Sequence, residues 1–230
     1  MDLTKPKDPL QSGYCTDENG EMHNDCSLTM CLDGCIREKV PNPTVNYNPL
    51  EDRNNKISSL AIVHHNVEMG KGNVIMEGAI IREGVTMGDN NYIGPYCIIG
   101  DPAEKIGYFD KPGRVVIGDG NRFTKQVTID AGTEKATTIG SGTILLKNAH
   151  VGHDAHIMSD VILSCNVCIG GHTTVWMRTN FGMGAAAHQR LEIPPGCMIG
   201  MNSTITKKTK MSPNKKYAGS PAREIGDNQR

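Results

Sequence analysis

The chain has 230 residues, a formal net charge of −1 at pH 7, 26 glycines and only 4% aromatic residues. This charge gives no general attraction to nucleic acid, and no apolar run of about 18 residues predicts a membrane span. Residues 1–14 lack the apolar core of a secretory signal, so we expect a cytoplasmic protein.

Residues 1–56 show no regular apolar period and are rich in Asp, Asn, Pro and Cys, which predicts a separate N-terminal arm or cap. Its four cysteines could hold a structural zinc ion, because thiolates are common zinc ligands. They are Cys15, Cys26, Cys31 and Cys35. The usual C-x-x-C pair is missing, so plain buried thiols in a reduced compartment are the alternative interpretation.

Residues 57–206 carry an apolar side chain at every sixth position, a period that fits neither a helix nor a flat strand. Glycine often follows that position, where a sharp corner needs it, and a mostly small residue comes four positions after it. This pattern is typical of a parallel β-helix built from hexapeptide repeats, with three hexapeptides in each coil. The positions are Val63, Met69, Ile75, Ile81, Met87, Ile93, Ile99, Ile117, Phe123, Ile129, Ile139, Leu145, Val151, Ile157, Leu163, Ile169, Val175, Phe181, Ala187, Ile193, Ile199 and Ile205.

Two polar segments interrupt the repeat, at residues 101–114 and near residues 131–138, where the phase slips by four residues. Loops that leave a regular scaffold commonly carry function. Residues 207–230 follow the last repeat and predict a short basic tail, for which a solvated segment is the default interpretation.

Three histidines lie near one edge of the predicted coils. His153, His172 and His188 are nearly one coil apart and face outward in the repeat frame, and His150 and Asp154 flank the first of them. A stacked imidazole cluster suits proton transfer near neutral pH. Surface histidines scattered by chance are the alternative.

At these residues the chain resembles the UDP-N-acetylglucosamine O-acyltransferases of lipid A biosynthesis, which are hexapeptide-repeat acyltransferases. NAHVGHDAHI is similar to that family's active-site strand, GGHTTV to its oxyanion strand and AAHQR to its His-Gln step. GSPAR resembles the exit from the helix, so the similarity covers about residues 60–223. The resemblance implies an all-β fold, a left-handed β-helix, and a homotrimer whose sites lie between neighbouring prisms.

The resemblance also implies an activity. An acyl chain would pass from a thioester of acyl carrier protein or coenzyme A to the hydroxyl of a nucleotide-linked amino sugar, with no cofactor required. His153 would be the general base, Asp154 would orient it, and Gly171 would offer its N–H to the oxyanion. The substrate-binding positions carried over are His150, His172, His188, Gln189 and Met201, the last of which would limit the length of the acyl chain.

The chain departs from the family at several places. Lys105 and Gly107 stand where the family's acceptor loop has an acidic residue and a lysine, and Asp130 replaces the histidine of VTIHRGT. The sequence ends soon after GSPA, before the family's helical C-terminal domain, so the basic tail could instead attract the acyl donor.

Two other functions remain open. One is a zinc-dependent enzyme resembling the trimeric γ-class carbonic anhydrases, although the three-residue spacing of His153 and His156 differs from that family's histidines. The other is a non-catalytic trimeric solenoid for binding or assembly.

Overall fold

The computed structural model describes residues 15–16, 22–23 and 54–229, and within them every regular element is a β-strand. Strands β1 (Cys15–Thr16) and β2 (Met22–His23) pair antiparallel, with Cys15 opposite His23. The other zinc candidates, Cys26, Cys31 and Cys35, lie outside the described residues. The chain divides into two units, Met1–Asn42 and Pro43–Arg230, and the second contains the repeat.

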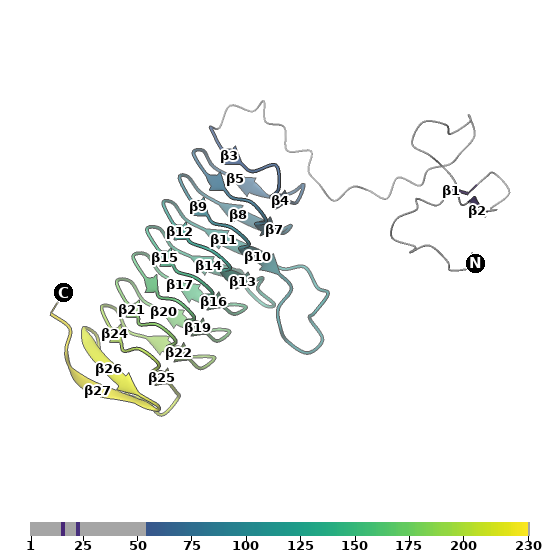
Figure 1. Ribbon diagram of the computed structural model, residues 1–230. Helices are drawn as coiled ribbons and strands as arrows, with labels where there is room; N and C mark the ends of the chain where they lie inside the picture. Colours follow the sequence, from purple (N-terminus) through teal and green to yellow (C-terminus); the bar gives the residue numbers. More distant parts are fainter. Residues whose placement is uncertain (1–14, 17–21, 24–53, 230) are drawn as a thin grey trace, which may run out of the picture. The chain divides into compact units, whose positions relative to one another are not determined.

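From β3 onward the chain winds into stacked coils of short strands, which form three sheets (Figure 1). Among the described residues, the eight-stranded sheet contains β4 (Ile62–Val63), β7 (Ile80–Ile81), β10 (Ile98–Asp101), β13 (Thr128–Asp130), β16 (His150–Val151), β19 (Cys168–Ile169), β22 (Ala186–Ala187) and β25 (Thr204–Ile205). The seven-stranded sheet contains β5 (Glu68–Met69), β8 (Val85–Met87), β11 (Val115–Ile117), β14 (Thr137–Ile139), β17 (His156–Ile157), β20 (Thr174–Val175) and β23 (Glu192–Ile193). The ten-stranded sheet contains β3 (Lys56–Ile57), β6 (Val74–Ile75), β9 (Tyr92–Ile93), β12 (Arg122–Phe123), β15 (Ile144–Leu145), β18 (Ile162–Leu163), β21 (Asn180–Phe181), β24 (Met198–Ile199), β26 (Lys215–Gly219) and β27 (Ala222–Asp227).

The hexapeptide period locates the core. In successive coils the repeat's apolar residue points inward and stacks on its equivalent, as Ile129, Val151 and Ile169 do, each fully buried. Burying one such side chain stabilises the fold by roughly 1.5–3 kcal/mol. The residue before it in each strand faces outward, so the outer faces are free to carry polar groups.

Both interruptions of the repeat emerge on the same side of the coil, after strands of the eight-stranded sheet. The first is the segment 102–114 between β10 and β11, which projects from the stack (Figure 1), and the second is the segment 131–136 between β13 and β14. After each one the chain returns to the ladder, because β13 pairs with β10 and β14 pairs with β11. The loops therefore add chain at one edge without disturbing the core.

The residues after 206 are more ordered than the basic tail we expected. Strand β26 joins the ten-stranded sheet parallel to β24, and β27 folds back antiparallel to β26. Tyr217 in β26 is fully buried, and its hydroxyl oxygen accepts the Ser212 N–H at 2.7 Å. This hairpin extends the core beyond the last coil, while Lys207, Lys208 and Lys210 stay exposed.

Candidate active site

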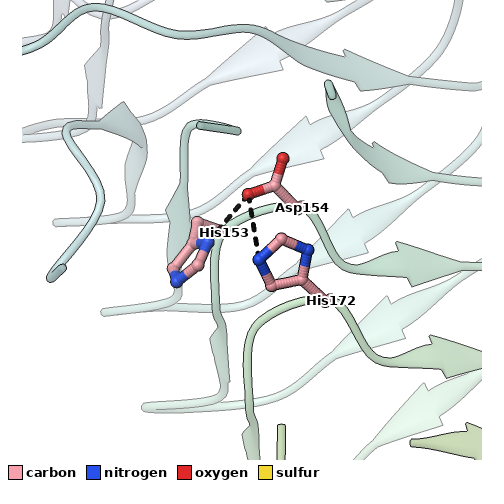
Figure 2. Close-up of side chains that lie close together, drawn as sticks. All are labelled: His153, Asp154 and His172. Carbon is pink, nitrogen blue, oxygen red and sulfur yellow. Dashed lines mark hydrogen bonds and ion pairs between the residues drawn. The ribbon is translucent and has the colours of Figure 1, made fainter. Parts of the chain in front are cut away.

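One edge of the prism carries the predicted catalytic residues. We call it the His153 corner; it comprises residues 152–154, 170–172 and 188–190 on successive coils. Figure 2 shows His153 and His172 both turned toward the carboxylate of Asp154. The two imidazole rings lie edge to face, with centroids 5.0 Å apart. The His172 N–H donates to the His153 carbonyl at 2.9 Å, which joins the two coils.

His153 and Asp154 form a hydrogen-bonded pair. Nδ1 of His153 lies 2.8 Å from Oδ2 of Asp154, whose side chain is almost fully buried. Asp154 has a left-handed backbone with φ of 57°, a conformation that aspartate tolerates better than most residues. An ionised carboxylate can only accept, so Nδ1 carries the proton and Nε2 keeps its lone pair. The imidazole is thereby oriented as a base.

The segment 131–136 encloses the Asp154 carboxylate with donors. The Thr133 hydroxyl donates at 2.7 Å, and the backbone N–H groups of Thr133, Glu134 and Lys135 donate at 3.0, 2.9 and 2.6 Å. Burial alone would raise the pKa of Asp154, but the bonds from His153 and from this loop hold that pKa well below its usual value. The carboxylate is therefore ionised at neutral pH.

A cation could in principle use this cluster. In the described part of the chain, His153, Asp154 and His172 offer ligand atoms within 4.8 Å of one another. Both oxygens of Asp154, however, already accept hydrogen bonds from His153 and the 133–135 backbone. This saturation suits proton transfer better than coordination of a metal.

Gly171 lies directly over the base. A Cβ added at Gly171 would lie 2.8 Å from Nε2 and 3.0 Å from Cε1 of His153. Only a glycine therefore leaves the Nε2 lone pair open. Within the described residues the Gly171 N–H donates to no acceptor, so it is available to a ligand beside the imidazole.

His172 completes the corner. Burial lowers the pKa of His172, with the Asp154 carboxylate acting against it, so the neutral imidazole is favoured at neutral pH. Its Nε2 is buried 3.7 Å from Asp154 and has no hydrogen-bond partner in the described part of the chain. A buried polar atom of this kind is costly unless a ligand satisfies it.

Three further predicted residues lie near this corner. His150, in β16, faces outward from the eight-stranded sheet, with its Nδ1 2.8 Å from the Thr128 hydroxyl. His188 and Gln189 are exposed on the next coil of the His153 corner, and His188 Nδ1 donates to the Gln189 carbonyl at 3.0 Å. The structure therefore brings the predicted histidines to one region of the surface.

Met201 is the exception. It is 65% exposed at the turn that follows β24, on the edge after the ten-stranded sheet. The His153 corner follows the eight-stranded sheet instead. Within one chain, Met201 and His153 thus occupy different edges of the prism.

The sequence marks Lys105 and Asp130 as departures from the family, but it does not predict their contacts around the base. Lys105, on the first interrupting segment, places its Nζ 3.2 Å from the Thr133 hydroxyl and 3.7 Å from a Glu134 carboxylate oxygen. Asp130 is buried 3.8 Å from His150 Nε2, and burial together with the charge of Glu104 raises the pKa of Asp130 to about 7. The phase slip near residues 131–138 predicts a loop there, but it does not predict that the N–H groups of this loop point at Asp154.

A groove adjoins the corner on the outer face of the seven-stranded sheet. It combines apolar side chains with one exposed cation, Arg190. Its lining residues are His156, Met158, His172, Thr174, Trp176, Arg190, Leu191 and Glu192. An elongated ligand could therefore run from His172 along this face.

Comparisons with known proteins bear on the family and the fold. The family "bacterial transferase hexapeptide (six repeats)" matches residues 66–101. An acyl-(acyl-carrier-protein)–UDP-N-acetylglucosamine O-acyltransferase from Paraburkholderia phytofirmans is 36% identical over 100 residues, covering 42% of this chain and 38% of the relative. The enzyme of the same name from Burkholderia mallei is 33% identical over 118 residues, covering 50% and 45%. The chain thus aligns with less than half the length of these relatives.

The predicted resemblance is confirmed. Among solved structures, the UDP-N-acetylglucosamine acyltransferase from Campylobacter jejuni aligns with a TM-score of 0.70 and 26% identity, over 77% of this chain and 72% of that one. The enzyme from Moraxella catarrhalis RH4 aligns over the same shares with a TM-score of 0.65 and 26% identity. The all-β fold and the left-handed parallel β-helix are confirmed as well. No helix long and apolar enough to cross a membrane occurs in residues 54–229 or the two described N-terminal strands.

Proposed function

We propose that this chain is an acyltransferase that moves an acyl group from a thioester to the hydroxyl of a nucleotide-linked amino sugar, in a lipid A-type pathway. Its relatives are named for acyl carrier protein and UDP-N-acetylglucosamine. The observation that carries the proposal is the state of His153: Nδ1 is bonded to Asp154, and Nε2 opens beneath Gly171.

The reaction follows from these positions. Nε2 of His153 takes the proton of the sugar hydroxyl while the hydroxyl oxygen attacks the thioester carbonyl carbon. The carbonyl oxygen becomes an oxyanion that the Gly171 N–H can stabilise. When the tetrahedral intermediate collapses, the C–S bond breaks and the leaving thiolate recovers the proton from Nε2. A positioned general base typically contributes about 10²- to 10⁴-fold in rate.

The surrounding residues suit the binding of two substrates. His150, His188 and Gln189 lie near the His153 corner and would position the acceptor sugar. The unpartnered Nε2 of His172 would bind the acceptor or the thioester arm. The groove beyond His172 would hold the donor chain, with Arg190 as an exposed cation in its lining. Acyl carrier protein and coenzyme A remain the two candidate carriers.

A homotrimer would complete the site. In a single prism residues 188–190 of the His153 corner are exposed to solvent, and Met201 lies on another edge. A neighbouring prism packed against the corner could bring its own Met201 to the donor groove. We therefore propose a trimer in which two chains form each site. Cytoplasmic localisation and a zinc ion on the N-terminal cysteines stay predictions.

The direct test is acyl transfer by the full chain. UDP-N-acetylglucosamine is incubated with acyl carrier protein thioesters or coenzyme A thioesters of several lengths, and O-acylated product is measured by mass spectrometry. We expect product with wild type and none above background with His153→Asn. A folded trimer that transfers no acyl group from either donor would contradict the proposal, and CO₂ hydration by the same sample would favour the carbonic-anhydrase alternative.

A further inference from the structure

A continuous chain of hydrogen bonds runs from the first interrupting segment to the catalytic imidazole. Lys105 Nζ donates to the Thr133 hydroxyl at 3.2 Å, and that hydroxyl donates to Asp154 Oδ2 at 2.7 Å. The same carboxylate oxygen accepts from His153 Nδ1 at 2.8 Å. The two segments that break the repeat, 102–114 and 131–136, therefore meet at the Thr133 hydroxyl, which is one hydrogen bond away from Asp154.

The direction of the Thr133 hydroxyl follows from its neighbours. A hydroxyl has one donor and two lone pairs. The Lys105 ammonium can only donate, so it takes a lone pair of Thr133 and leaves the hydroxyl proton for Asp154. The Lys105 ammonium also lies 4.5 Å from the centroid of the Tyr108 ring, which helps to hold it in place. The resemblance assigned an acidic residue to the position of Lys105, so this contact is a feature of the present chain.

A hydrogen-bond donor to Asp154 Oδ2 changes the proton affinity of His153, because His153 Nδ1 bonds the same oxygen. Each hydrogen bond to a carboxylate disperses part of its negative charge, and bonds in a chain polarise one another. Asp154 with a strong hydroxyl donor stabilises the imidazolium less, so His153 is more often neutral and ready to accept a proton.

We propose that Thr133, oriented by Lys105, is a positioning residue that sets the proton affinity of His153 through Asp154. The proposal rests on the proposed function in taking His153 as the base. The positioning role of Thr133 is argued from the hydrogen-bond distances. Without the hydroxyl, the backbone N–H groups of Thr133, Glu134 and Lys135 would still hold the loop to Asp154.

Other ionisable groups also act on His153, and the variants below leave them in place. Asp154 and His172 face it within the corner, and Asp130 and His150 face it from the eight-stranded sheet. Further groups act on these neighbours: Glu134 and Arg190 on His172, and Glu104 on Asp130 and His150.

The experiment compares three single variants of the full chain with wild type. Thr133→Val removes the hydroxyl at nearly constant shape, and Thr133→Ser restores it. Thr138→Val is the matched control, because the Thr138 hydroxyl bonds a different imidazole, His156 Nδ1, at 2.9 Å. The pKa of His153 is measured by NMR titration of histidine labelled at Cε1, with His153→Gln assigning the signal. This readout needs no turnover, so the absence of acyl transfer would overturn the proposed function and leave this test valid.

We expect Thr133→Val to raise the pKa of His153 by about one unit, because Asp154 then interacts more strongly with the protonated than with the neutral imidazole. The acidic limb of kcat/KM against pH should move upward by the same amount. Thr133→Ser and Thr138→Val should both stay at the wild-type value. An unmoved pKa in Thr133→Val, an equal rise in Thr133→Ser, or an equal rise in Thr138→Val would each overturn the proposal. Should Thr133→Val fail to fold, Lys105→Met replaces it, with a smaller rise expected and an unchanged pKa contradicting the role.

Discussion

His153 and His156 lie three residues apart on one coil, yet their surroundings differ. His156 belongs to a regular strand, β17, and its Nδ1 meets the hydroxyl of Thr138 one coil earlier in the ladder. His153 lies at a corner beside an interruption of the repeat, and its Nδ1 meets an ionised, buried carboxylate. In the regular repeat a histidine meets a neutral hydroxyl one coil away, as His156 meets Thr138. The extra residues of segment 131–136 instead supply the donors that stabilise the buried charge of Asp154. A buried carboxylate needs several donors, and an uninterrupted corner has no chain from which to supply them.

The largest expected effect is a loss of acyl-transfer rate on removal of His153 but not of His156. His153→Ala should lower the rate of acyl transfer by about 10²- to 10⁴-fold, because the general base is lost. The side chain lies outside the apolar core, so His153→Ala should stay folded, with a modest fall in melting temperature because Asp154 loses one hydrogen-bond donor. His156→Ala is the matched control and should keep activity within about tenfold, since it removes a groove contact and the hydrogen bond with Thr138 but no group bonded to Asp154. Steady-state kinetics and thermal unfolding of both variants provide the check, and equal losses would remove the distinction between them.

The buried charge of Asp154, the partner of His153, can be tested through its contribution to the free energy of unfolding. Because the pKa of Asp154 is lower in the folded than in the unfolded chain, its contribution to the free energy of unfolding is fully present above about pH 4. That contribution is lost as the pH falls toward the folded-state pKa. Asp154→Asn should lower the free energy of unfolding by about 2–3 kcal/mol at neutral pH, since the donors of segment 133–135 lose an ionised acceptor.

Denaturant unfolding of Asp154→Asn and wild type between pH 3 and 7 would measure this difference. The gap should narrow below about pH 4, where the wild-type carboxylate begins to lose its advantage. A gap that stays constant across the range would show that Asp154 contributes packing rather than charge.

Much of the scaffold could be predicted from the sequence, because the six-residue period reports directly on which side chains face inward. Ile129, Val151 and Ile169 are fully buried and stacked, as the period requires. The edge shared by His153 and His172 followed from the same spacing. These features depend on local repetition, which a sequence displays.

The surroundings of the base could not be predicted in the same way. The donors on Asp154 come from backbone groups of Thr133, Glu134 and Lys135, and backbone N–H groups leave no signature in side-chain identity. Lys105 reaches Thr133 from a segment without any repeat. The buried hairpin strand containing Tyr217 escaped prediction for a related reason, because five lysines between residues 207 and 216 mask its apolar residues.

Gly171 tests whether substrate reaches His153 at Nε2, the ring nitrogen that faces away from Asp154. Gly171→Ala would place a methyl group 2.8 Å from Nε2 and 3.0 Å from the His153 carbonyl oxygen, so the imidazole must turn away. A displacement of about 1 Å in a catalytic group can cost on the order of 10²-fold in rate. We expect kcat to fall by that amount while the KM of the sugar nucleotide changes little. Wild-type kcat in Gly171→Ala would show that Nε2 is reached from another direction.

The smallest expected effect concerns the edge of the prism that follows the ten-stranded sheet. Met201 is 65% exposed there, and in the proposed trimer a neighbouring chain would bring it to the end of the donor groove. A Met side chain in that place would favour medium-length acyl chains, and Met201→Gly should shift preference toward longer ones. Each additional buried methylene is worth about 0.8 kcal/mol, so a few carbons should change selectivity by more than about tenfold. Competition between donors of graded length measures this change. Because Met201 is largely exposed within one chain, its removal should leave the stability of the coil nearly unchanged, and an unaltered length profile would place Met201 outside the groove.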